Sequence, residues 1–166
     1  MTTDTEFQIT DEMKAQIGVE SEPWEYEVTT TSVRMYARGI GSDDPIHYDV
    51  DFAKAQGFRS IVAPLGYIGT PVYLPGTNDP TFGFPRRGGG PRLNIPFKGL
   101  LDGGTETEYL DVICAGDVLV ETSHLADLKL RDRPGGKMLF VTNEAVYKDK
   151  TSGKVVAKMR LTSIHM

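Results

Sequence analysis

Two carboxylates and an imidazole lie close together in one short string, Ser42-Asp43-Asp44-Pro45-Ile46-His47. An imidazole titrates near neutral pH, and a carboxylate that steadies it makes the pair a general acid and base. Asp44 lies three residues before His47. An Asp-Asp-Pro string before a helix is also common turn and cap chemistry, which is the alternative interpretation.

The remaining reactive residues indicate neither a metal site nor a covalent mechanism. Cys114 is the only cysteine, so the chain forms no internal disulfide. It lies in the apolar string Val112-Ile113-Cys114-Ala115, which favours packing over a role as a nucleophile. Three widely spaced histidines and one cysteine offer no metal-ligand spacing. No motif pairs a nucleophile with a base as acyl-enzyme chemistry requires.

Length and composition indicate one ordinary globular domain. The chain has 166 residues, of which 39% are hydrophobic and 25% charged, enough for a single domain with a real core. The net charge of -5 argues against nucleic-acid binding, which needs a basic surface. No signal-like start and no long apolar run occur, so we expect a cytoplasmic protein without a membrane segment.

The first seventy residues mix short helices with one strand. Residues 1–9 are expected to be a loose polar leader, and Thr10 then opens a short helix that Gly18 closes. Residues 24–28 alternate as a strand with one buried face. A second helix, which Thr30-Thr31-Ser32 can cap, is predicted from apolar residues spaced by three and four: Val33, Tyr36, Ala37 and Ile40.

The rest of the chain changes from helix to strand. Residues 51–56 predict a helical turn, and residues 65–74 favour an irregular helix packed on a sheet. Residues 75–97 are rich in proline and glycine, which indicates a long functional loop or an oligomer arm. Four strands are then predicted, at residues 105–112, 118–131, 138–149 and 155–164. Helices on one side of an antiparallel sheet make a single α+β domain over residues 1–166.

Two segments resemble a known family. Residues 36–49, followed by Phe52-Ala53 and Gly57-Phe58, resemble the signature of R-specific enoyl-CoA hydratases and MaoC-like dehydratases, in which a Gly-Asp-x-Asn-Pro-Ile/Leu-His string precedes a small-residue helix. Residues 101–119 resemble the amino-terminal type of MaoC-like domain, often one half of a double-hot-dog hydratase. The closing strand with Gly153-Lys154-Val155-Val156-Ala157 fits the same pattern. The resemblance implies a hot-dog fold, an antiparallel sheet wrapped around a central helix.

The resemblance also implies a catalytic site. In catalytic members an Asp and a His hold one water that adds to an enoyl thioester. His47 stands at the family's His position, whereas the family's Asp falls on Ser42 and its Asn on Asp44. Three alternatives follow: Asp44 supplies the carboxylate, a shifted turn brings Asp43 into that role, or Ser42 leaves the chain as a supporting half whose partner carries the chemistry.

Substrate contacts implied by the resemblance lie further along the chain. The backbone N–H groups of Leu65 and Gly66, after Pro64, would hold the thioester oxygen. Tyr67 either packs in the core or contacts the acyl chain. Three arginines are either solvated or bind the phosphates of coenzyme A: Arg86, Arg87 and Arg92. Coenzyme A is expected as part of the substrate, and no separate cofactor is expected.

Together these features imply a hydro-lyase that acts on an enoyl or 3-hydroxyacyl thioester (acyl-CoA), with His47 as general acid and base. The alternative is a non-catalytic acyl-CoA-binding subunit of a heteromeric MaoC-like hydratase. Domains of this family usually pair their sheets edge to edge. We therefore expect a homodimer or higher homo-oligomer, or a heterodimer with a second MaoC-like chain.

Overall fold

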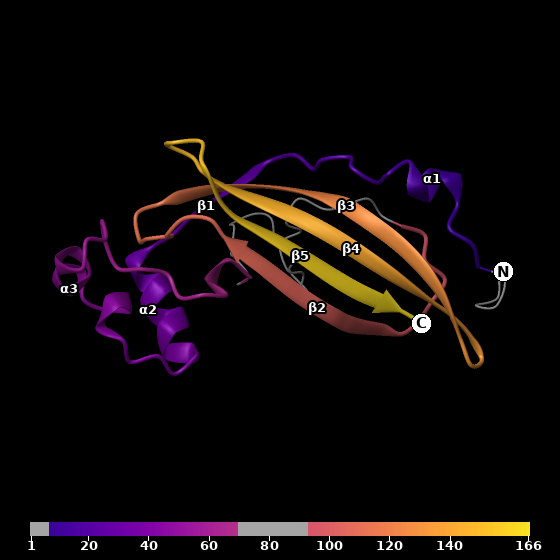
Figure 1. The fold of residues 1–166 in the computed structure, drawn as a ribbon, viewed down its shortest axis with the longest axis horizontal. Helices are drawn as coiled ribbons and strands as arrows, with labels where there is room; N and C mark the ends of the chain where they lie inside the picture. The colour runs from indigo at the N-terminus through magenta and orange to yellow at the C-terminus, as the bar shows by residue number, and fades with distance from the viewer. Residues whose placement is uncertain (1–6, 70–92) are drawn as a thin grey trace, which may run out of the picture.

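The computed structural model describes residues 7–69 and 93–166, and these ranges are dominated by one antiparallel sheet (Figure 1). Its strands lie in the order β1 (Trp24–Glu27), β3 (Val118–Arg133), β4 (Gly136–Asp149), β5 (Val155–His165) and β2 (Leu100–Tyr109). Each pair of neighbours runs antiparallel. The strands predicted from alternation are confirmed, and β1 and β2 form the two edges.

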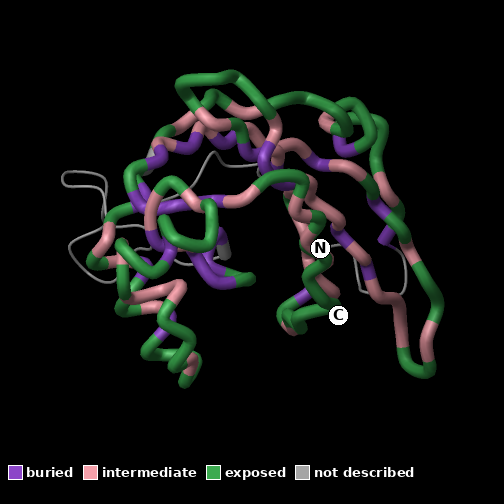
Figure 2. The backbone as a smooth tube through the Cα atoms, turned by 60° about the vertical axis from the view of Figure 1, so that its left-hand side comes forward, coloured by how far each residue is buried: buried purple, intermediate pink, exposed green. Residues whose placement is uncertain are grey.

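The long hairpin of β3 and β4 follows directly from the sequence pattern. Leu139, Val141 and Ala145 of β4 are buried, and the residues between them are more exposed. Buried and partly exposed segments alternate along the backbone in Figure 2. Pro134-Gly135 makes the turn, and Gly135 has a φ of 83°, a conformation that favours glycine. Both strands run closer to this turn than predicted.

β2 begins at Leu100, five residues before the predicted strand. The pairing with β5 shifts register between Asp102 and Gly104, so the glycine pair Gly103-Gly104 forms a bulge inside the strand. Gly104 has a φ of 118°, which few other residues adopt. The bulge explains why a pattern of strict alternation finds only the second part of the strand.

The helices are short and gather mainly at one end of the sheet. Figure 1 shows α2 (Thr30–Gly39) and α3 (Val50–Ala55) together at that end, and α1 (Asp11–Lys14) beside β3 toward the other. Two 3₁₀ turns, η1 (Pro45–His47) and η2 (Tyr67–Gly69), complete the set in the described ranges. Within those ranges no helix is long and apolar enough to cross a membrane.

The predicted α2 is confirmed with two corrections. Its N-cap is Thr29, not Thr30–Ser32: the Thr29 hydroxyl accepts a hydrogen bond from the Ser32 N–H at 3.1 Å, and the Ser32 hydroxyl accepts one from the Thr29 N–H. Val33 and Ala37 are fully buried, but Ile40 is 54% exposed. The helix ends at Gly39, so Ile40 leaves the direction of the buried stripe.

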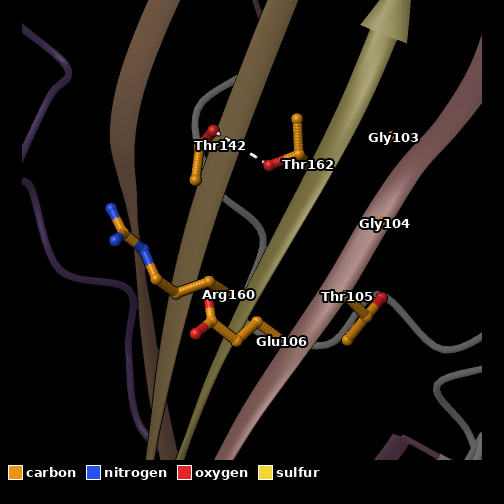
Figure 3. A pocket seen from close by; sticks show the side chains of 7 residues that line it. All are labelled: Gly103, Gly104, Thr105, Glu106, Thr142, Arg160 and Thr162. Carbon is orange, nitrogen blue, oxygen red and sulfur yellow. Dashed lines mark hydrogen bonds between the residues drawn. The ribbon is translucent and has the colours of Figure 1, made fainter.

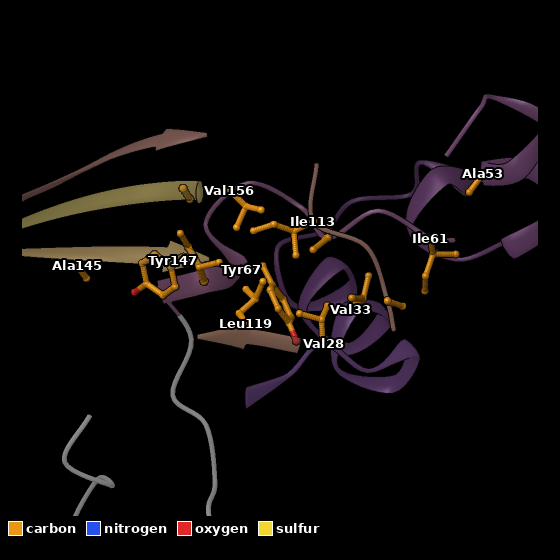
Figure 4. Close-up of a cluster of buried hydrophobic side chains, with 14 residues drawn as sticks. Val28, Val33, Ala53, Ile61, Tyr67, Ile113, Leu119, Ala145, Tyr147 and Val156 are labelled. Atoms are coloured by element: carbon orange, nitrogen blue, oxygen red, sulfur yellow. The ribbon is translucent and has the colours of Figure 1, made fainter. Parts of the chain in front are cut away.

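Two groups of buried side chains form the core. The larger joins α2 and the segments around it to the sheet (Figure 4) and includes Val33, Ile61, Leu119 and Tyr147. The second lies where Phe7 and Phe97 meet Leu139, with the two rings in edge contact at 5.1 Å.

Some predictions fall partly outside the described residues. Phe7, inside the predicted loose leader 1–9, is 5% exposed, so the leader prediction is wrong at this residue. Residues 93–97 of the predicted loop 75–97 form neither helix nor strand, and residues 75–92 lie outside the described ranges. Of the predicted helix 65–74, the structure describes η2 and nothing beyond residue 69, so a central helix stays a prediction.

Candidate functional site

The string around His47 folds into η1, with Asp44 as its N-cap. Asp44 has extended backbone angles, and its Oδ1 accepts a hydrogen bond from the Ile46 N–H at 3.0 Å. Pro45 suits the first helical position because it has no N–H to satisfy. The cap interpretation of Asp44 is therefore confirmed, and η1 places His47 at its last residue.

The His47 imidazole is held in one orientation by the backbone. Its Nδ1 lies 2.7 Å from the carbonyl oxygen of Val62, and the side chain is half-buried. A carbonyl oxygen only accepts, so in the neutral ring Nδ1 carries the proton and Nε2 keeps its lone pair. The Val62 N–H donates in turn to the Ile46 carbonyl at 3.0 Å. These two bonds hold η1 against the Val62 segment and leave Nε2 as the ring nitrogen that does not contact it.

The expected carboxylate partner is not brought onto this imidazole. In the described part of the chain, no hydrogen bond or ion pair joins His47 to an Asp or Glu. Asp44 is exposed and its Oδ1 serves the cap, whereas Asp43 is exposed and has no cap role. The Ser42 N–H donates to the Ala37 carbonyl at 3.0 Å, and the Ser42 carbonyl accepts from the Tyr48 hydroxyl at 2.5 Å. Ser42 therefore contributes two backbone contacts, and the one to Ala37 closes the end of α2.

An ion pair anchors the segment that bears Val62. Asp117, 9% exposed, accepts hydrogen bonds from the Arg59 guanidinium and from the Cys114 N–H at 2.8 Å. The bond to Asp117 raises the pKa of Arg59. Val62 pairs with Cys114 in an isolated β-bridge. Cys114 is fully buried, and burial raises the pKa of its thiol, which agrees with a packing role.

The predicted carbonyl-binding amides lie just beyond this segment. Gly66 has a φ of 89°, and a Cβ there would lie 2.5 Å from the Tyr36 hydroxyl oxygen, so only glycine fits. The Gly66 N–H donates to the Tyr109 hydroxyl at 2.7 Å. Leu65 is 75% exposed. Sequence reasoning missed Tyr109 because 43 residues separate it from Gly66 and no local pattern marks the contact.

Tyr67 follows these amides but points into the core. It is 4% exposed, its ring meets that of Tyr36 edge-on at 5.8 Å, and its hydroxyl lies 2.6 Å from the Ser32 hydroxyl. Burial raises the pKa of Tyr67, so the phenol stays neutral. This arrangement agrees with the packing interpretation, and contact with an acyl chain stays a prediction.

A polar hollow of about 420 Å³ lies elsewhere, on the strands (Figure 3). It is lined by Gly103, Gly104, Thr105, Glu106, Thr142, Arg160 and Thr162. Arg160 pairs with Glu144 at 3.5 Å. Both residues alternate along their strands with Met159 and Ala145, which belong to the core, so this hollow opens on the opposite face of the sheet.

Other predicted contacts are not described. Arg86, Arg87 and Arg92 lie outside the described ranges, so binding of coenzyme A phosphates stays a prediction. Within residues 7–69 and 93–166, no group of three His, Cys, Asp or Glu side chains is arranged to hold a metal ion.

Comparison with known proteins relates this geometry to a family. The model of the family described as "FAS1-like, dehydratase domain region" matches residues 15–159. A UPF0336 protein of Parafrankia sp. (strain EAN1pec) is 30% identical over 138 residues, 80% of each chain.

Solved structures agree on the fold. A MaoC-like dehydratase superposes with a TM-score of 0.70 at 24% identity, covering 92% of this chain and 43% of that chain. A chain of the C-terminally truncated HadBC complex of Mycobacterium tuberculosis, a 3R-hydroxyacyl-ACP dehydratase, superposes with a TM-score of 0.67 at 18% identity, covering 90% of this chain and 96% of that chain. The sheet and helices described above therefore form the hot-dog fold of the MaoC-like dehydratases, as the sequence resemblance implied.

Proposed function

Because the chain belongs to the FAS1-like dehydratase family, we propose that it adds water to, or removes it from, an enoyl or 3-hydroxyacyl thioester. The observation that carries the proposal is the 2.7 Å contact between His47 Nδ1 and the Val62 carbonyl. This contact selects the tautomer whose Nε2 can accept a proton. A general base needs an oriented lone pair, and the neutral His47 ring offers one at Nε2.

The reaction needs a proton to leave water and a proton to reach the substrate. Nε2 of His47 takes a proton from water as the water oxygen adds to the β-carbon. The electron pair of the double bond moves through the α-carbon toward the thioester oxygen, and the imidazolium then returns a proton to the α-carbon. A carboxylate beside the water would steady the imidazolium. Asp43 is the better candidate for it, because Oδ1 of Asp44 is engaged by the Ile46 N–H.

A second candidate function is a supporting half of a two-chain hydratase. It is favoured by the absence, within the described residues, of any carboxylate bonded to His47, and by Ser42 at the family's Asp position. The similar HadBC structure is a complex, which is consistent with chains of this fold working in pairs. In this case the chain would shape the acyl site while its partner supplies the acid and base.

We expect either form to assemble through β2. This strand is an edge of the sheet, most of its residues are exposed, and Leu100 and Leu101 are 64% and 49% exposed. Unpaired edge strands with apolar side chains readily pair with another chain. Light scattering after size exclusion should give a dimer or larger species, and Leu101→Arg should shift it toward monomer. A strictly monomeric wild-type chain would refute self-assembly through β2. Only pairing with a second MaoC-like chain would then remain.

The deciding experiment is hydration of a panel of short, long, branched and polycyclic enoyl-CoA thioesters by the purified chain. His47→Ala should abolish turnover, and Asp43→Asn should reduce it strongly. His124→Ala is the matched control, because His124 lies in β3 and should leave turnover unchanged. If the chain binds these thioesters but hydrates none, it is the supporting half. If it neither binds nor hydrates them, both candidate functions are wrong.

A further inference from the structure

Tyr109 of β2 contacts Gly66, the residue before η2. The family resemblance implies that the Gly66 amide binds a substrate oxygen. The Gly66 N–H donates to the Tyr109 hydroxyl oxygen at 2.7 Å. The oxygen acts as the acceptor in this bond, so the hydroxyl hydrogen remains available for donation. Within the described ranges, no hydrogen bond uses that hydrogen.

The surroundings keep this hydroxyl a donor. Tyr109 is half-buried, and burial raises its pKa, so the phenol stays protonated in neutral solution. A hydroxyl oxygen that accepts an N–H hydrogen bond is polarised and donates more strongly through its own hydrogen. Gly66 and Leu65 are exposed, so a ligand can approach the pair from solvent.

A second tyrosine, Tyr36, also lies close to Gly66. A Cβ at Gly66 would lie 2.5 Å from the Tyr36 hydroxyl oxygen, so two phenols from different elements lie next to Gly66. Of the two, Tyr109 receives the Gly66 N–H, whereas Tyr36 has no hydrogen bond to it. The two tyrosines are therefore chemically alike neighbours with different roles, which makes Tyr36 a matched control.

We propose that the Tyr109 hydroxyl, backed by the Gly66 N–H, binds the carbonyl oxygen of the acyl thioester. A thioester oxygen is purely an acceptor and gains negative charge as water adds, so an oriented neutral donor suits it in both states. The inference rests on the proposed function, since it requires an acyl thioester as ligand. It holds equally whether the chain is catalytic or a supporting half, because the contact is one of binding.

Calorimetric titration with butyryl-CoA and with its thioether analogue, in which a methylene replaces the carbonyl, tests the contact without requiring turnover. The wild-type chain should prefer the thioester by about 3- to 10-fold, the range of one hydrogen bond. Tyr109→Phe should lower the ratio to about 1, whereas Tyr36→Phe should keep it. Far-UV circular dichroism verifies that both variants fold.

Several outcomes overturn the inference. Equal affinity of the wild-type chain for thioester and thioether shows that no donor recognises the carbonyl. A preference that survives in Tyr109→Phe assigns the donor to another group. Tighter thioester binding by Tyr109→Phe identifies the Gly66 N–H as the donor and Tyr109 as its competitor. Absence of binding for both ligands in the wild-type chain refutes the proposed function itself.

Discussion

The Arg59–Asp117 ion pair makes a quantitative prediction, because it supports the segment whose carbonyl orients His47. Asp117→Ala removes the carboxylate that accepts from the Arg59 guanidinium and from the Cys114 N–H. Asp117 is 9% exposed, whereas the Arg59 side chain is 52% exposed. The two lost hydrogen bonds therefore differ in cost: water can hydrate the guanidinium, but the Cys114 N–H is left without its acceptor inside the core.

The expected loss of stability combines these two effects. An orphaned buried N–H costs about 1–3 kcal/mol, and a hydrogen bond to a charged group contributes about 1.5–3 kcal/mol when buried. Because Arg59 is half-exposed, its bond belongs below that range, near the value of about 1 kcal/mol for exposed ion pairs. We expect Asp117→Ala to lower the free energy of unfolding by about 3 kcal/mol.

Urea unfolding followed by far-UV circular dichroism measures this change. Lys14→Ala is the control, since Lys14 pairs with Asp11 at 3.0 Å while both are largely exposed, and its loss should stay below about 0.5 kcal/mol. Arg59→Ala combined with Asp117→Ala should add little to the single Asp117 change, because both act in one network. A loss for Asp117→Ala no larger than that of Lys14→Ala would refute the reasoning.

Three further predictions follow from local geometry. Gly66→Ala should lower the midpoint of thermal unfolding, because φ is 89° and the new Cβ meets the Tyr36 hydroxyl. Adding Tyr36→Phe should restore part of the lost stability. If it restores none, the predicted clash is wrong. Asp44→Ala should destabilise the chain by about 0.5–2 kcal/mol in urea unfolding, whereas Asp44→Asn should not, because Asn is an equally good cap. If Asp44→Asn retains hydration activity, the Asp44 carboxylate has no part in catalysis. The Ser152 hydroxyl lowers the pKa of Asp149, so this carboxylate adds stability above the usual Asp pKa of about 3.9 that is lost as pH falls through the lowered value. Ser152→Ala should raise the Asp149 pKa in a carbon-detected NMR titration, and an unchanged pKa would assign the shift to the backbone.

Much of the fold could be predicted because its determinants are local. The capping hydroxyl of Thr10 and the alternation in β4 depend on residues a few positions apart, and both match the structure. The errors also have local causes. Ile40 fits the apolar stripe of α2 but lies at its C-cap, and the Gly103-Gly104 bulge interrupts the alternation that would mark the start of β2.

By itself the sequence identified the α+β class, the family and the string that ends in His47, because periodicity, capping and motif spacing are properties of neighbouring residues. Only the tertiary structure decided which groups the candidate site residues contact. The Val62 carbonyl selects the His47 tautomer across 15 residues, and Tyr109 meets Gly66 across 43. Such contacts depend on how distant segments pack, and side-chain chemistry alone does not specify which donor will meet which acceptor. The cap role of Asp44 is a local contact that the sequence already offered as an alternative, and the structure confirms it through the Ile46 N–H.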